Sequence, residues 1–152
     1  MAELERVRVW AEALIRLHLD DTWSFGFDRA AKRAGLTNYT TRRITVSKHL
    51  AARWDDDEVH QTLLHEVAHA MAGAAAGHGP EWRRTARELG YVGGRTHQGE
   101  IAAERAGWVG LCPGGHEHVR FRAPRGRYAC KPCTRSTRRV VEIRWQRRQQ
   151  AA

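Results

Sequence analysis

Two histidines and a glutamate in the middle of the chain have the spacing of a water-activating metal site. The motif is His65-Glu66-Val67-Ala68-His69. In a helix, residues four positions apart project from the same face, so both imidazoles can bind one Zn²⁺ at about 2.0–2.1 Å. Glu66 directly follows the first histidine, and its carboxylate can take a proton from a water at the metal. We therefore predict that His65 and His69 are zinc ligands and that Glu66 is the general base.

A catalytic zinc usually keeps three protein ligands and one open position, so a third ligand is needed. His78 is the preferred residue because the glycines on both sides of it let the backbone turn sharply and bring the imidazole back to the metal. A carboxylate could take its place, and the alternatives of that kind are Glu81, Glu88 and Glu100. The competing interpretation is a surface helix that carries its histidines by chance, followed by an ordinary loop histidine.

A second group of metal-ligand residues lies near the C-terminal end. Cys130 and Cys133 have the Cys-x2-Cys spacing, in which two thiolates on one tight turn can share a metal. Cys112 and His116 supply the other half, with His118 as the alternative to His116. We predict a closed, structural Cys₃His zinc ribbon, with a short hairpin between its halves at about residues 119–128. Three unrelated thiols are the competing interpretation.

The net charge of +9 comes entirely from the last third of the chain. Residues 1–100 hold 14 Lys and Arg against 14 Asp and Glu, whereas residues 101–152 hold 12 against 3. A basic module attached to a neutral one indicates an anionic partner, and nucleic acid is the usual one. The alternative is a weakly structured basic tail.

Aromatic rings among guanidinium groups suit single-stranded DNA, because bases stack on the rings and phosphates pair with the cations. We predict single-stranded or non-specific DNA contacts from seven residues of the basic segment: Arg120, Arg122, Arg125, Arg127, Tyr128, Arg138 and Arg139. Alternatively, the aromatic residues Phe121 and Tyr128 form only the small core of the ribbon.

The elements that must position these residues follow from the periodicity of apolar side chains. Helical spacing predicts three helices, at about residues 3–20, 57–72 and 80–89. Alternation predicts two strands, at residues 23–28 and 43–47, with turns or loops at 30–38 and 91–100. The apolar residues of 140–145 predict a final strand or helix. Residues 43–47 are also the natural candidate for a strand that pairs with an extended substrate, although a core strand without that role is favoured slightly.

The motifs taken together resemble the SprT-like family of zinc metallopeptidases. The resemblance rests on His65-Glu66-Val67-Ala68-His69-Ala70, a short connector of small residues, and Gly77-His78-Gly79-Pro80-Glu81-Trp82. Similarity extends upstream to residues 23–28, 33–35 and 43–47 and downstream to the ribbon, so that it covers roughly residues 4 to 135. It implies zinc at His65, His69 and His78 with Glu66 as general base. The ribbon departs from the family's commoner four-cysteine form.

Length, composition and the resemblance together set the expected architecture. We expect an α+β fold with a minimal zincin-like metalloprotease core at residues 1–105, made of an N-terminal helix, a small sheet and the His-Glu-x-x-His helix. A basic zinc-ribbon module with an Arg-rich end follows at residues 106–152. The sequence shows no apolar run of about 18 residues and no secretory signal. We therefore expect a cytoplasmic, nucleoid-associated monomer that does not contact membranes.

The expected function is that of a zinc metalloendopeptidase acting on proteins bound or crosslinked to DNA, with one catalytic and one structural Zn²⁺. The family includes proteases with that activity and bacterial members whose activity is less well defined. The alternative is a nucleic-acid-binding, regulatory protein with a zinc-stabilised core and no physiological protease activity. A third possibility is another metallohydrolase, such as an amidase. Peptide deformylases share the motif but need an upstream cysteine ligand, and no cysteine precedes His65.

Overall fold

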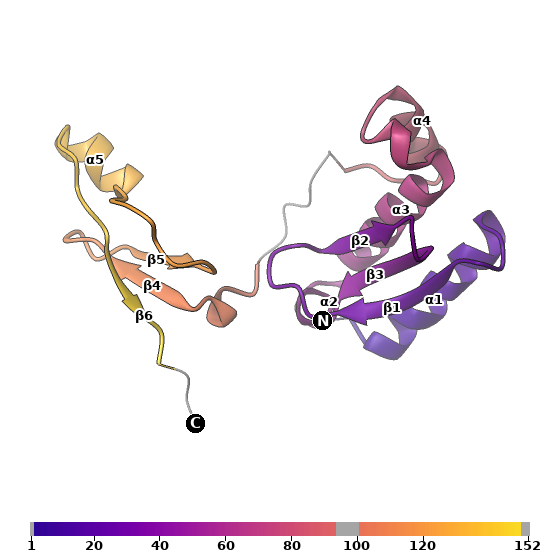
Figure 1. Ribbon diagram of the computed structural model, residues 1–152, viewed down its shortest axis with the longest axis horizontal. Helices are drawn as coiled ribbons and strands as arrows, with labels where there is room; N and C mark the ends of the chain where they lie inside the picture. The colour runs from indigo at the N-terminus through magenta and orange to yellow at the C-terminus, as the bar shows by residue number, and fades with distance from the viewer. Residues whose placement is uncertain (1, 94–100, 150–152) are drawn as a thin grey trace. The chain divides into compact units, whose positions relative to one another are not determined.

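The computed structural model describes residues 2–93 and 101–149 (Figure 1). The chain divides into two compact units, Met1–Ile101 and Ala102–Ala152. Helices and two small sheets make the fold α+β, as the sequence predicts. None of the helices in the described part of the chain combines the length and apolar content that crossing a membrane requires.

The first unit is built on a three-stranded sheet with the order β1-β3-β2. β3 (Arg43–Ser47) lies in the centre, parallel to β1 (Ser24–Asp28) and antiparallel to β2 (Gly35–Asn38). Because both sides of β3 are already paired, it cannot add a substrate strand, and its assignment as a core strand is confirmed. The buried side chains of Ile44 and Val46 agree with that position.

The prediction of a turn-like segment at residues 30–38 is wrong over its last four residues, which form β2. Gly35 looks like a breaker in the sequence, yet it starts the strand and pairs with Val46. The pairing that holds β2 is a contact between distant segments, and local composition does not reveal such contacts.

Four helices belong to the same unit: α1 (Leu4–His18), α2 (Lys48–Ala51), α3 (Asp56–Ala72) and α4 (Pro80–Glu88). The three predicted helices are thereby confirmed to within two residues, and the short α2 is an addition. α1 buries Val7, Ala11 and Ile15, which repeat at the spacing of one helix face. α3 packs against α1, β2 and α4 and so lies at the centre of the unit (Figure 1).

The beginning of α3 is fixed by a capping box. The Asp55 carboxylate accepts a hydrogen bond from the Glu58 backbone N–H at 2.8 Å, and the Glu58 carboxylate accepts one from the Asp55 N–H at 3.3 Å. This arrangement satisfies two donors at the helix N-terminus. At the other end, Gly73 leaves the helix at a φ of 89°. A single 3₁₀ turn, Ala74–Ala76, then leads toward α4.

The second unit holds an antiparallel sheet with the order β5-β4-β6 and one short helix. Its elements are β4 (Trp108–Leu111), β5 (Glu117–Arg120), α5 (Lys131–Thr137) and β6 (Arg144–Arg147), preceded by a 3₁₀ turn at Ala103–Arg105. Of the strand or helix predicted near the end of the chain, the structure has the strand, at Arg144–Arg147. The hairpin predicted at residues 119–128 is wrong, because β5 pairs with β4 and the turn runs through residues 112–116. Pro124, which has no N–H to give to a ladder, lies in the segment that stays irregular.

Candidate metal centres and their surroundings

Three imidazole nitrogens converge at one point of the first unit. The Nε2 atoms of His65 and His69 are 3.2 Å apart, those of His69 and His78 are 2.9 Å apart, and those of His78 and His65 are 3.2 Å apart. Three nitrogens bound to one tetrahedral zinc at about 2.0–2.1 Å lie roughly 3.3–3.4 Å from one another. The observed triangle is slightly smaller, so the three side chains fit a single zinc ion with a small outward movement.

The local backbone explains how the three histidines meet. His65 and His69 lie one turn apart on α3, and His78 returns from the turn between α3 and α4. Gly77, just before His78, has a φ of 50° and a ψ of −132°, a conformation that side chains with a Cβ rarely adopt. The carboxylates considered as third ligands do not join the cluster: Glu81 and Glu88 are exposed on α4, and Glu100 lies outside the described residues.

Burial favours the metal-binding form of this cluster. Burial, together with the smaller effect of the neighbouring His78, lowers the pKa of His69 to about 4. A histidine with such a pKa is neutral at pH 7, and neutral imidazole is the form that offers a lone pair to zinc. The donor set and the neutral form of His69 therefore both fit zinc.

Trp82 of α4 holds all three imidazoles in place. Its ring stacks on His69 at 5.1 Å and meets His65 and His78 edge-on at 4.8 Å and 4.6 Å. The indole N–H donates to the backbone carbonyl of His65 at 3.4 Å. The side chain is only 3% exposed. Trp82 belongs to the motif that carries the family resemblance, where its role is not evident, and the structure shows that the three histidines pack against its ring.

Glu66 is buried on the side of α3 that faces β2. The Thr37 hydroxyl donates to its Oε2 at 2.8 Å and to its backbone carbonyl at 2.9 Å. Burial raises the pKa of Glu66 to about 7, although the Thr37 hydrogen bond and the positive charge of Arg33 work against that rise. A carboxylate whose pKa lies near neutrality suits a group that both takes and returns a proton.

Gly35 makes room for this carboxylate. A Cβ at residue 35 would lie 2.7 Å from Cγ and 2.8 Å from Oε1 of Glu66, closer than carbon and oxygen atoms can approach. The space beside the carboxylate thus depends on a residue without a side chain. Sequence reasoning missed both β2 residues, Gly35 and Thr37, because their contact with α3 spans some thirty residues of chain.

Two tyrosines lie within the electrostatic reach of Glu66. Burial and the Glu66 charge raise the pKa of both Tyr39 and Tyr91, so each phenol keeps its proton at neutral pH. Tyr39 donates to the backbone carbonyl of His69 at 3.3 Å. The Tyr91 ring meets His65 edge-on at 5.3 Å and Trp82 at 5.9 Å. Tyr91 therefore places a protonated phenol beside one of the three histidines.

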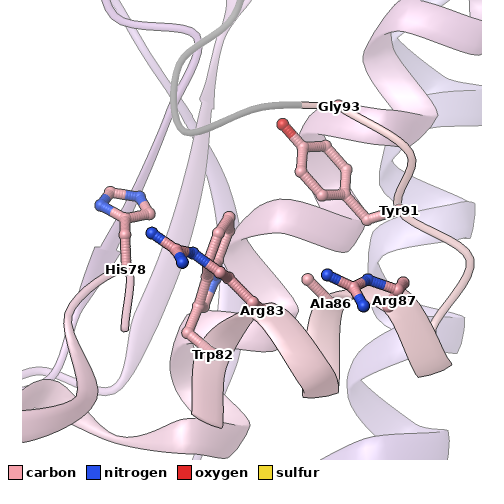
Figure 2. Close-up of a pocket in the computed structure, with 7 residues that line it drawn as sticks. All are labelled: His78, Trp82, Arg83, Ala86, Arg87, Tyr91 and Gly93. Carbon is pink, nitrogen blue, oxygen red and sulfur yellow. The ribbon is translucent and has the colours of Figure 1, made fainter. Parts of the chain in front are cut away.

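A pocket of about 200 Å³ opens beside the histidine cluster (Figure 2). Its lining comes from α4 and from the segments on either side: His78, Trp82, Arg83, Ala86, Arg87, Tyr91 and Gly93. The side chains of Trp82 and Ala86 are buried and form its apolar surface. One metal-ligand residue and two guanidinium groups therefore border the same space.

The second unit contains a four-residue cluster of the Cys₃His type. The Sγ atoms of Cys112 and Cys133 are 3.6 Å apart, and Nδ1 of His116 lies 3.5, 3.2 and 3.6 Å from the sulfurs of Cys112, Cys133 and Cys130. A disulfide needs about 2.05 Å, whereas ligands of one tetrahedral zinc at about 2.3 Å lie roughly 3.5–3.8 Å apart. The spacing therefore fits zinc. His118 lies outside the cluster, with its ring against Trp145 at 6.5 Å.

The residues predicted to contact DNA differ in exposure and in the contacts that they already make. Arg120 is partly buried, with its guanidinium 4.2 Å from the ring centre of Tyr128 and 6.0 Å from that of Trp145. Arg127 is exposed but binds Glu142 through paired hydrogen bonds of 2.8–3.1 Å. The remaining four arginines are exposed on the surface of the unit: Arg122, Arg125, Arg138 and Arg139.

Comparison with known proteins places the chain by a protein-family model. The description of the matching protein-family model is the SprT-like family, and the match covers residues 5–103. Within that stretch lie the three histidines, Glu66, Thr37 and Trp82. No curated protein and no solved structure matches the chain.

Proposed function

The chain belongs to the SprT-like family, and from that premise we propose that it is a zinc-dependent metallopeptidase with a minimal zincin-like core. The observation that carries this proposal is the convergence of three histidine Nε2 atoms, which lie 2.9–3.2 Å from one another. A buried glutamate, Glu66, directly follows the first of these histidines on α3. A structural metal site would need only the ligands. The buried carboxylate beside them, held by Thr37, supplies a proton acceptor in addition.

The roles of the residues follow from this geometry. His65, His69 and His78 would hold the zinc, which supplies Lewis-acid polarisation of a peptide carbonyl and of a water molecule. Glu66 takes a proton from the attacking water and returns it to the amine that leaves. Thr37 orients the Glu66 carboxylate for both transfers. Trp82 keeps the imidazoles at the angles that the ligand set requires.

Tyr91 would donate a hydrogen bond to the carbonyl oxygen as negative charge develops on it. Its ring lies against His65, and its phenol remains protonated because burial and Glu66 raise its pKa. We expect Tyr91→Phe to lower kcat by about 10- to 100-fold, with zinc content unchanged. An unchanged kcat would remove Tyr91 from the mechanism.

An extended substrate would pair with β2 rather than with β3. β2 is an edge of the sheet among the described strands, and it packs directly on α3. Thr37, in the same strand, contacts Glu66. A peptide added to this edge would therefore run past the general base, and its backbone hydrogen bonds would supply binding that does not depend on side chains.

We further propose that the second unit directs the enzyme to proteins bound or crosslinked to DNA. Exposed arginines supply phosphate contacts, and the rings of Tyr128 and Trp145 lie beside Arg120, where bases could stack. The zinc ribbon would fix this surface, because the three cysteines of the Cys₃His group pack with Ile143 in one buried cluster, against which Tyr128 and Trp145 lie.

The test is proteolysis of a DNA-bound basic protein by zinc-loaded enzyme, with and without single-stranded DNA. Glu66→Gln, which keeps the size of the side chain and the ligands, is the control. Cleavage that requires Glu66 establishes the peptidase, and a further requirement for DNA establishes the ribbon as its DNA sensor. Tight DNA binding at full zinc occupancy without any cleavage would instead favour a nucleic-acid-binding, regulatory protein, for which the arginine and aromatic surface of the ribbon is the supporting observation.

A further inference from the structure

The pocket beside His78 contains two cations on one face of α4. Arg83 and Arg87 are one helical turn apart, and both side chains are exposed. Figure 2 shows the Arg83 guanidinium turned toward His78 and the Arg87 guanidinium turned back along the helix toward Ala86. Among the ion pairs that the described residues form, neither arginine has a carboxylate partner. Both arginines thus line a space next to the proposed reaction centre, and no described carboxylate forms an ion pair with either of them.

We propose that Arg83 and Arg87 recognise an acidic side chain of the protein substrate, Asp or Glu, at a position next to the bond that is cleaved. The inference rests on the proposed peptidase function and specifies its substrate class. The pocket is bordered by the metal-ligand residue His78, so a substrate side chain entering it belongs to a residue close to the reacting carbonyl. Guanidinium groups bind carboxylates through paired hydrogen bonds, and a second cation one turn away can hold the other oxygen.

The size of the pocket favours a single side chain over a nucleic acid backbone. Sites for whole small ligands usually enclose about 300–1,000 Å³, and this pocket has about 200 Å³. Trp82 and Ala86 provide an apolar surface for the methylene groups of Glu, and Tyr91 closes one side. A DNA strand would need a row of cations along its path, yet residues 1–100 hold 14 Lys and Arg against 14 Asp and Glu, with no net charge.

The test compares peptides that differ only in one residue, which is Glu, Gln or Lys, placed in turn at each position around the scissile bond. Cleavage by the zinc-loaded full chain is measured as kcat/KM. Binding of the same peptides to the inactive Glu66→Gln variant is measured by calorimetry, which provides a readout that does not depend on turnover. The variant Arg83→Glu with Arg87→Glu reverses the charge of the pocket. Arg84→Glu is the matched control, because Arg84 lies on the same helix but does not line the pocket.

We expect a preference of roughly tenfold for Glu over Gln at one position, both in kcat/KM and in binding. The double variant should lose that preference and favour Lys, whereas Arg84→Glu should behave as the unmodified protein does. Misfolding cannot produce a reversed preference, so this result would support the inference directly. Cleavage without any preference for Glu would overturn the inference and leave the proposed peptidase intact.

Two further outcomes separate the possibilities. Absence of cleavage by the zinc-loaded protein, together with unselective peptide binding by Glu66→Gln, would overturn both the proposed function and the inference. The affinity for a short single-stranded DNA is measured in parallel with the same variants. If the double variant weakens DNA binding and leaves peptide preference unchanged, the two arginines contact phosphate, and the acidic-substrate inference is wrong.

Discussion

At the scale of the residue, the site depends on how Glu66 is surrounded. The residue is 7% exposed, and its carboxylate receives one hydrogen bond from Thr37 and lies beside the space left by the absent side chain of Gly35. Burial raises its pKa toward neutrality, whereas the hydrogen bond keeps its direction fixed. Burial therefore acts on the protonation state of Glu66, whereas the Thr37 hydrogen bond acts on the position of its carboxylate.

The raised pKa of Glu66 predicts how the stability of the zinc-free protein varies with pH. The folded state holds this proton up to about pH 7, whereas the ordinary pKa is 4.5. The contribution of Glu66 to the free energy of unfolding is therefore complete below pH 4.5 and is lost as the pH rises through 7. At 1.36 kcal/mol per pKa unit, the loss amounts to about 3 kcal/mol. Chemical denaturation from pH 4.5 to 8 measures this loss, with the unmodified protein and Glu66→Gln both treated with chelator.

The difference in the free energy of unfolding between the unmodified protein and Glu66→Gln isolates the contribution of Glu66, since the histidines contribute equally to both proteins. His69, whose folded pKa is lowered to about 4, stabilises the protein above its ordinary pKa of 6.5 and loses that contribution as pH falls toward 4. The unmodified protein should lose stability relative to Glu66→Gln as the pH rises. Parallel pH profiles for the two proteins would contradict the burial argument.

Gly35→Ala should impair the reaction without removing the metal. The new Cβ would lie 2.7 Å from Cγ of Glu66, so the carboxylate must move away from the Thr37 hydroxyl. A displacement of about 1 Å of a reacting group costs on the order of 100-fold in rate. We expect that loss in kcat, with zinc content unchanged by atomic absorption. Gly126→Ala is the control, because a Cβ at residue 126 meets no atom within 4 Å and should leave kcat unchanged.

At the scale of the element, α3 carries two of the proposed zinc ligands and the proposed base, and a capping box fixes where the helix begins. Asp55→Ala removes the hydrogen bond that the Glu58 N–H donates to the Asp55 side chain, and leaves only the bond from the residue 55 backbone N–H to the Glu58 carboxylate. We expect a loss of about 1 kcal/mol in the free energy of unfolding, measured by denaturant titration. Asp57→Ala deletes an acid of the same turn outside the cap and should cost less. Equal losses would show that charge, not the cap, stabilises this end.

The helices could be predicted from the sequence because their signals are local. α3 shows its acidic first turn and its apolar spacing within its own residues, and α4 begins at Pro80. β2 could not be predicted, because what stabilises it is its pairing with β3 and its contact with Glu66. The ribbon hairpin was placed wrongly for the same reason, since the partner of β5 precedes Cys112.

The sequence predicts the three histidines of the site but not the residues that hold them and Glu66 in place. Helical spacing places His65 and His69 together, and the glycines around His78 suggest its return. Nothing in the pattern shows that Trp82 contacts all three imidazoles, or that Thr37 donates to the base. These contacts join segments from three parts of the chain, and only the folded arrangement reveals them.

At the scale of the whole molecule, charge and chemistry are separated along the chain. The His cluster lies in the unit whose Lys and Arg balance its Asp and Glu, and the basic excess accompanies the Cys₃His cluster. A module that binds phosphate without sequence preference raises the concentration of the enzyme on DNA and leaves the choice of peptide to the other unit. The two properties should therefore change independently in variants.

The basic excess predicts the salt dependence of DNA binding. For single-stranded DNA, the slope of log K against log salt is about −0.7 for each phosphate neutralised. Arg138→Gln with Arg139→Gln, both exposed in the ribbon unit, should reduce the magnitude of that slope by about 1.4 and weaken binding to all sequences alike. Fluorescence anisotropy over a salt series measures it. Arg16→Gln with Arg29→Gln removes the same charge from the first unit, and because those arginines lie outside the proposed DNA surface, the slope should stay unchanged. If both pairs reduce the slope equally, DNA responds to the net charge of the protein, and the ribbon is not its specific contact surface.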